Sequence, residues 1–253
     1  MLYLLAAIGI PAVIIIPWFV YKKQKSIKRD HLFSESKTFL KEKSIIVLPF
    51  KNISPDPDQE YFSDGLTEEI IADLSSVDDL LVISRSSAMT FKGTDKTLRD
   101  VVNEVGVRYV LEGSVRKSGN NIRIVAQLID GSSDTHIWAD KYNGILEDIF
   151  AIQERVSRSI AEALRIKLST EEKVILSRQP IDSLEVYDYY LKARQEIYRL
   201  SEEGLDRAIH YLERGLQIGG ENTLLYSCLG NAYYQYWNLG IRIDDSYLSK
   251  ARD

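Results

Sequence analysis

The sequence predicts an α/β domain with a mixed sheet, preceded by one transmembrane helix and followed by an all-α helical repeat. Residues 2–21 are uncharged and almost wholly apolar, which is typical of a membrane span. Apolar and polar residues alternate beside a turn at residues 118–120, which indicates a β-hairpin. From residue 184 onward apolar residues recur at helical intervals, which indicates a run of helices.

The apolar run at residues 2–21 has the length that a membrane span requires. A helix rises about 1.5 Å per residue, so about 20 residues cross a hydrocarbon core of about 30 Å. A cleaved signal peptide is the alternative, but its basic residues precede the apolar run, whereas Lys22 and Lys23 follow this one. We therefore expect a single-pass membrane anchor.

The basic juxtamembrane linker, residues 22–43, predicts the orientation of this anchor. Lysine and arginine next to a membrane span stay in the cytoplasm, and the linker begins with Lys22, Lys23, Lys25, Lys28 and Arg29. We therefore expect the soluble part to be cytoplasmic. A basic or folded segment ahead of Met1 would reverse the orientation and place the soluble part in the periplasm.

The predicted α/β domain covers residues 44–168. Residues 44–50 form a nearly continuous apolar run, which is typical of a strand buried on both faces. After a proline-containing turn, Asp64 can cap a helix that carries Glu68 and Glu69 near its start, where carboxylates suit the helix dipole. The buried face of this helix is expected to hold Leu66, Ile70, Leu74 and Val77.

The next predicted elements are a strand at residues 80–85 and a short helix. Thr97 is positioned to cap this helix, and Gly106 is positioned to end it. The apolar side of the helix is expected to contain Leu98, Val101, Val102 and Val105.

The clearest local pattern is a hairpin whose strands are residues 107–117 and 121–130. A strand at residues 136–142 and a long amphipathic helix at residues 146–168 complete the domain. The predicted order is β-α-β-α-β-β-β-α. Crossovers combined with an antiparallel hairpin imply a mixed sheet covered by helices.

These residues resemble the TolB-type amino-terminal domain. The resemblance rests on residues 44–74, on RYVLEGSVRKSGNNIRIVAQLID at 108–130 and on HIWADKY at 136–142. This version of the domain occurs in bacterial proteins beside class III adenylate cyclase or winged-helix regulatory domains, commonly followed by tetratricopeptide repeats. The resemblance implies a recognition module, and it transfers no catalytic residue. Together with the predicted anchor, it leads us to expect a location at the bacterial inner membrane.

Residues 184–253 resemble tetratricopeptide helices. The spacing of Tyr226, Leu229, Gly230 and Tyr233 is similar to the first helix of such a repeat, where a small residue lets the partner helix approach. The residues Gly219 and Gly220 depart from the usual end of a second helix. We expect an incomplete array, because about three repeats are normally needed to bury the repeat faces.

No residue pattern points to catalysis, a cofactor or a metal. His31, His136 and His210 lie in separate segments without a second ligand at metal spacing, and Cys228 is the only cysteine of the sequence. The net charge of -5 provides no positive field for nucleic acid. We expect no enzyme activity, no cofactor, no metal and no nucleic-acid partner.

The tyrosine-rich helices contain the candidate protein-binding residues. Packing in the core is the default role of such rings, but some could face a partner: Tyr190, Tyr233, Tyr234 and Trp237. The leading hypothesis is therefore a membrane-anchored protein-interaction or signalling module whose partner is unidentified. The alternative is the ligand-sensing portion of a larger cyclase or transcription-regulator protein.

Overall fold

A mixed sheet forms the centre of the α/β part. The computed structural model describes residues 42–241 and 249–250. In these residues the strands lie in the order β3-β1-β4-β5-β6, and β2 pairs with β4. β1 runs parallel to β3 and β4, whereas β5 is antiparallel to β4 and β6. The predicted mixed sheet is confirmed. The bounds are β1 Ser44–Val47, β2 Lys51–Asn52, β3 Leu81–Val82, β4 Tyr109–Ser118, β5 Asn121–Asp130 and β6 Thr135–Ile145.

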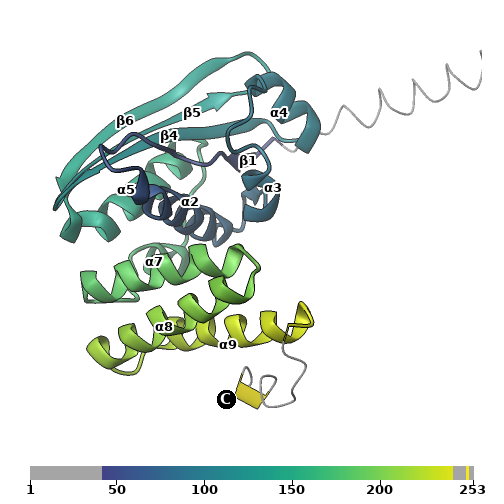
Figure 1. Ribbon diagram of the computed structural model, residues 1–253. Coiled ribbons are helices and arrows are strands. Elements are labelled where there is room, and N and C mark those ends of the chain that lie inside the picture. The colour runs from purple at the N-terminus through teal and green to yellow at the C-terminus, as the bar shows by residue number, and fades with distance from the viewer. Residues whose placement is uncertain (1–41, 242–248, 251–253) are drawn as a thin grey trace, which may run out of the picture. The chain divides into compact units, whose positions relative to one another are not determined.

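Helices cover both faces of this sheet. Figure 1 shows α2 and α5 on one face and α4 on the other. Their apolar sides supply the core, because α2, α4 and α5 each bury aliphatic residues. The bounds of the helical elements in this part are η1 Pro57–Gln59, α2 Glu60–Ser75, α3 Arg85–Met89, α4 Leu98–Val105, η2 Leu146–Asp148, α5 Ile149–Ala163 and α6 Thr170–Leu176.

The short helix and the hairpin are confirmed where the sequence predicted them. The Thr97 side chain accepts a hydrogen bond from the Asp100 backbone N–H, and the Asp100 carboxylate accepts one from the Thr97 backbone N–H, so α4 begins with a capping box. Gly106 ends α4 in the left-handed conformation, at φ +72°. In the hairpin, β4 and β5 pair from Tyr109↔Asp130 to Ser118↔Asn121.

The start of α2 differs from the prediction. The helix begins at Glu60, and Asp56 caps the preceding η1 turn by accepting a hydrogen bond from the Asp58 backbone. Asp64 therefore lies inside the helix, where its carboxylate binds Lys92 Nζ at 2.5 Å. Glu68 and Glu69 lie well beyond the first turn, so the predicted interaction with the helix dipole is wrong, because that effect fades within the first turn.

The predicted helix at residues 146–168 is interrupted. α5 ends at Ala163, and Arg165 adopts a positive φ of 55°, which a continuing right-handed helix does not allow. A separate helix, α6, then starts with a capping box between Ser169 and Glu172. β2, α3 and α6 have no counterpart among the elements predicted from the sequence.

An all-α part follows the α/β part, as predicted. Its helices are α7 Leu184–Tyr198, α8 Glu202–Gly219 and α9 Thr223–Asn238. Ser183, Ser201 and Asn222 cap them by accepting hydrogen bonds from backbone amides. α7 packs against α2, and α8 contacts both α7 and α9 (Figure 1). The assignment of these helices to tetratricopeptide repeats stays a prediction.

The predicted anchor at residues 2–21 lies outside the described residues, as does most of the linker at 22–43. Within the described ranges, none of the helices has the length and apolar character of a membrane span.

Candidate interaction site on the helical part

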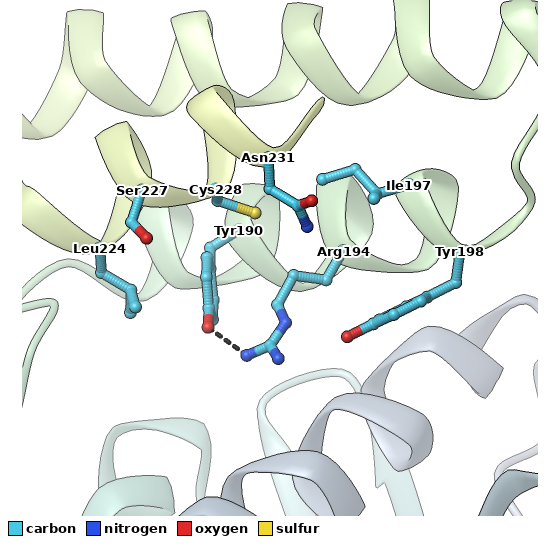
Figure 2. Close-up of a pocket in the computed structure, with 8 residues that line it drawn as sticks. All are labelled: Tyr190, Arg194, Ile197, Tyr198, Leu224, Ser227, Cys228 and Asn231. Atoms are coloured by element: carbon cyan, nitrogen blue, oxygen red, sulfur yellow. Dashed lines mark hydrogen bonds between the residues drawn. The ribbon is translucent and has the colours of Figure 1, made fainter. Parts of the chain in front are cut away.

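A cavity of about 340 Å³ lies between α7 and α9. Figure 2 shows its lining. The two helices come together because both also pack against α8. The cavity combines aliphatic and aromatic walls with a guanidinium, a thiol, a hydroxyl and an amide. The lining residues are Tyr190, Arg194, Ile197 and Tyr198 from α7, and Leu224, Ser227, Cys228 and Asn231 from α9.

Arg194 connects this cavity to the α/β part. Its Nη1 lies 2.9 Å from Glu69 Oε1, and its Nη2 forms an ion pair with Glu68. The same Nη1 donates a hydrogen bond to the Tyr190 hydroxyl (Figure 2), which itself donates to Glu69 Oε1 at 3.2 Å. Because two carboxylates of α2 balance its charge, Arg194 serves as a structural cation rather than as an anion receptor.

Glu68 is the centre of this charged contact, and its side chain is well buried. Its Oε2 lies 3.0 Å from Arg85 Nε, and its Oε1 accepts a hydrogen bond from the Tyr198 hydroxyl at 2.5 Å. Glu68 is 7% exposed, although adjacent carboxylates on a helix are usually solvated. We call Glu68, Glu69, Arg85, Arg194 and Tyr198 the α2–α7 junction, because they join the two parts of the described chain.

The charges of the junction are stabilised by one another. Burial raises the pKa of Glu69, and the Arg194 guanidinium opposes this rise. Burial alone would lower the pKa of Arg194. The electrostatic interaction with Tyr190, Glu68 and Glu69 outweighs burial and holds that pKa above its ordinary value. Arg194 therefore keeps its proton at any physiological pH. A buried pair of this kind is costly to break, because the remaining charge loses its partner.

A close backbone approach supports the same contact. A Cβ atom at Gly65 would lie 2.6 Å from Leu191 Cδ2, which is closer than carbon atoms approach without a shift. Glycine at this point of α2 therefore lets α7 pack directly against it. Leu191 is 1% exposed, so this contact belongs to the core.

Asp73 lies one turn beyond Glu69 on α2 and faces α5. Its Oδ2 accepts a hydrogen bond from Ser157 Oγ at 3.1 Å. Burial raises the pKa of Asp73 to about 7, the Ser157 hydrogen bond opposes the rise, and the charges of Glu69 and Glu154 add to it. Asp73 therefore changes its charge close to neutral pH.

Cys228 is a poor nucleophile in this setting. Burial raises the pKa of its thiol to about 11, and the charge of Arg194 lowers it by less than burial raises it. The thiolate is the reactive form of cysteine, so this side chain is a packing element of the cavity.

The structure divides the predicted protein-binding residues into two groups. Tyr190 lines the cavity but is 2% exposed and bonded to the junction. Tyr234 and Trp237 are exposed on α9, with ring centroids 6.2 Å apart. Tyr233 is half-buried, and Lys250 Nζ lies 5.5 Å from its ring centroid. The structure therefore brings Tyr233, Tyr234 and Trp237 together on one helix and leaves Tyr190 inside.

Tyr226 is an exposed aromatic residue outside the set of binding candidates predicted from the sequence. It is 49% exposed, and it precedes Tyr233 by seven residues and Trp237 by eleven, so helical spacing places the three on one face. The sequence contained this spacing, but packing between helices could account for it equally well. We call Tyr226, Tyr233, Tyr234 and Trp237 the α9 aromatic face.

Metal-binding groups are not assembled in the part of the chain that the structure describes. There, no cluster of three or more His, Cys, Asp or Glu side chains has the arrangement of a metal site. His136 lies on β6 and His210 on α8. His31 lies outside the described residues.

Comparison with known proteins gives one family model and one relative with high sequence identity. The model of the HilA/YgeH-like transcriptional regulator, second domain, matches residues 41–159. A protein of Rhizobium meliloti (strain 1021) named "Putative adenylate cyclase 3" is 50% identical over 176 residues, which cover 69% of this chain. The chain spans 30% of the length of that relative.

Solved structures match this chain at low similarity. TolB from Acinetobacter baumannii shares 20% identity at a TM-score of 0.37, over 48% of this chain and 28% of its own. The LpoB C-terminal domain from Escherichia coli shares 17% identity at a TM-score of 0.34, over 42% of this chain and 85% of its own. Both TM-scores are low, so these structures say nothing about the function of this chain.

Proposed function

We propose that the chain is a membrane-anchored interaction or signalling module without catalytic activity, which contacts a protein partner through the α9 aromatic face. The observation that carries this proposal is the exposure of Tyr226, Tyr234 and Trp237 on one helix, at 49%, 44% and 39%. Tyrosine and tryptophan are enriched at the energetic centres of protein interfaces. A large exposed aromatic cluster is otherwise unfavourable in water.

The ion pairing and protonation of the buried polar side chains support a role without catalysis. The Glu68 and Glu69 carboxylates are held by arginines, and burial keeps the Cys228 thiol protonated. Groups that are fixed in ion pairs or kept neutral are poor general bases and nucleophiles. The purified chain should therefore form no cyclic AMP from ATP and Mg²⁺ or Mn²⁺. Formation of cyclic AMP above a buffer control would contradict the proposal.

The proposed location is the bacterial inner membrane, with the soluble part in the cytoplasm. The basis is the apolar run at residues 2–21 and the basic residues that follow it. Reporters active only in the cytoplasm or only in the periplasm, fused after Asp253, test this orientation. Periplasmic activity would contradict it and would favour a segment ahead of Met1.

Capture of a partner from membranes tests the proposed surface. We expect a protein recovered with the wild-type chain to be lost with the double variant Tyr234→Ser and Trp237→Ser. Val174→Ser is a matched control, because Val174 is 54% exposed and lies on α6. Equal recovery with all three chains would remove the α9 aromatic face as the binding surface.

A second candidate function is the sensory portion of a longer cyclase protein. The 50% identity with the relative named as an adenylate cyclase favours it, because the matched region covers only 30% of that protein. In this case the partner of the module would be an output domain of the same polypeptide. A continuous reading frame that joins this chain to a cyclase sequence would support it.

A further inference from the structure

A second cavity, of about 680 Å³, lies where β1 ends. After β1 and β2, α2 leads to β3 on one side of β1 and lies on one face of the sheet (Figure 1). α4 precedes β4 on the other side of β1 and lies on the opposite face. The connections on the two sides of β1 therefore run in opposite directions, which defines a topological switch point. Ligands of open sheets with parallel strands bind at such points, outside the carboxyl ends of the strands.

An interruption of the sheet opens this cavity. Leu48 N donates to Leu111 O at 2.8 Å, and Ile53 N donates to Val115 O at 2.8 Å. Between them Pro49 has no N–H, and Phe50 N donates to Thr67 Oγ1 of α2 at 3.0 Å. The chain thus leaves the edge of β4 and returns to it. Glu112, Gly113 and Ser114 of β4 line the cavity beside this interruption.

The floor of the cavity is apolar and firmly packed. A Cβ atom at Gly113 would lie 2.7 Å from the Phe50 ring, so the ring rests directly on the glycine backbone. Phe50, Phe91 and Val101 are 1%, 7% and 2% exposed and all line the cavity. Small-molecule sites are commonly concave, apolar and about 300–1,000 Å³ in volume, and this cavity fits that range.

The lysines at the rim of the cavity differ in whether a carboxylate neutralises their charge. Lys92 Nζ pairs with Glu60 at 2.7 Å and with Asp64 at 2.5 Å, and Lys96 Nζ pairs with Glu104 at 2.5 Å. Glu112 accepts a hydrogen bond from Gln127 Nε2. Within residues 42–241, Lys51 is the lysine of this rim whose side chain forms neither an ion pair nor a hydrogen bond. A positive charge next to an apolar floor is thereby left for a ligand.

We propose that this cavity binds a small amphipathic anion, a carboxylate with an apolar ring or tail. The apolar portion lies against Phe50, Phe91 and Val101, and the carboxylate lies at Lys51. This site is distinct from the α9 aromatic face and does not depend on the function proposed for it.

The wall of the cavity is continuous with the α2–α7 junction. Residues 91–94 line the cavity, and Thr90 alone separates them from α3, whose first residue is Arg85. Arg85 pairs with Glu68 and lies over Tyr198. A ligand that holds Phe91 in place therefore also restrains the segment that contacts α7.

Binding can be tested with the full chain in lipid nanodiscs. Equilibrium dialysis with radiolabelled phenylpropionate measures the affinity, and empty nanodiscs correct for partition into lipid. Phenylpropylamine, which has the opposite charge on a similar skeleton, serves as a competitor. The variant Lys51→Glu reverses the rim charge. Lys167→Glu makes the same change of net charge at an exposed position away from the cavity.

We expect saturable binding of phenylpropionate, and Lys51→Glu should raise its Kd about tenfold, as expected for the loss of one favourable charge contact. Lys167→Glu should leave the Kd unchanged, and phenylpropylamine should not compete. Hydrogen exchange should slow in peptides that contain residues 91–94 and 112–114. The proposal is overturned if nothing binds, if Lys51→Glu binds like the wild type, if the amine competes equally, or if protection lies elsewhere.

Discussion

The guanidinium of Arg85 lies over the ring of Tyr198, with its central carbon 3.4 Å from the ring centroid. This stacking joins the first residue of α3 to the last residue of α7. A cation over an aromatic face is attracted by the ring quadrupole, and exclusion of water strengthens the attraction. Together with the Glu68 ion pairs, it makes the α/β part and α7 a single packed unit.

Loss of the Glu68 carboxylate should destabilise this unit strongly. Glu68→Ala leaves Arg85 and Arg194 without their shared partner, and breaking a buried pair costs about 3 kcal/mol or more. Urea unfolding should show this loss in the free energy of unfolding. Glu104→Ala is the control, because the Lys96–Glu104 pair is exposed, at 43% and 52%, and should contribute less than about 1 kcal/mol. Equal losses would show that the junction contributes no more than a surface pair.

The close approach of α2 and α7 predicts an unusual response to a glycine substitution. Alanine in place of glycine normally stabilises a helix interior by about 0.5–1 kcal/mol. Gly65→Ala should instead lower the free energy of unfolding by about 1–3 kcal/mol, because its Cβ meets Leu191. Adding Leu191→Val should recover part of the loss. A stabilised Gly65→Ala variant would contradict the described packing of α7 on α2.

Asp73 should make stability depend on pH. Burial raises its folded pKa to about 7, whereas the ordinary value is 3.8, so between these values the folded state holds a proton that the unfolded state has lost. The contribution of the protonated Asp73 to the free energy of unfolding is complete below about pH 4 and is lost as the pH rises through 7. The free energy of unfolding falls as the pH rises between about 4 and 7, because the unfolded chain binds fewer protons than the folded chain in this range.

Asp73→Asn removes this titration and should flatten the pH dependence of the free energy of unfolding between about pH 4 and 8. Urea unfolding at several pH values measures it, with Asp95→Asn at an exposed position as the control. An unchanged slope in Asp73→Asn would show that Asp73 titrates normally.

Cys228 should react slowly in the folded chain. Burial raises the pKa of its thiol to about 11, so little thiolate exists at pH 8. We expect a maleimide to modify the folded protein much more slowly than the chain in urea. Rapid labelling without denaturant would show that the cavity between α7 and α9 opens readily.

Local patterns predicted much of the fold. The hairpin and α4 are determined by turn and cap residues close in sequence, Ser118, Gly119 and Asn120 for the first and Thr97 with Gly106 for the second. β2 has two residues and α3 has five, which are too few for a periodic pattern. The break after α5 depends on the backbone conformation of Arg165, which residue type does not predict.

The candidate site was predicted only in part. The exposed rings of Tyr234 and Trp237 lie on a helix that the spacing indicated. The junction could not be predicted, because Glu68, Arg85 and Arg194 come from distant segments and meet only after α7 packs on α2. The acidic pair Glu68 and Glu69 therefore resembled a solvated helix face in sequence, although Glu68 is buried and Glu69 is half-buried.

Site-specific photo-crosslinking in cells is the most direct measurement of the proposed function. A photoreactive amino acid at position 237 should give a discrete adduct with one protein, and the same group at position 174 on α6 should not. Tyr234→Ser should reduce the adduct at position 237. The absence of an adduct at position 237, or identical adducts at both positions, would contradict a protein partner bound at the α9 aromatic face.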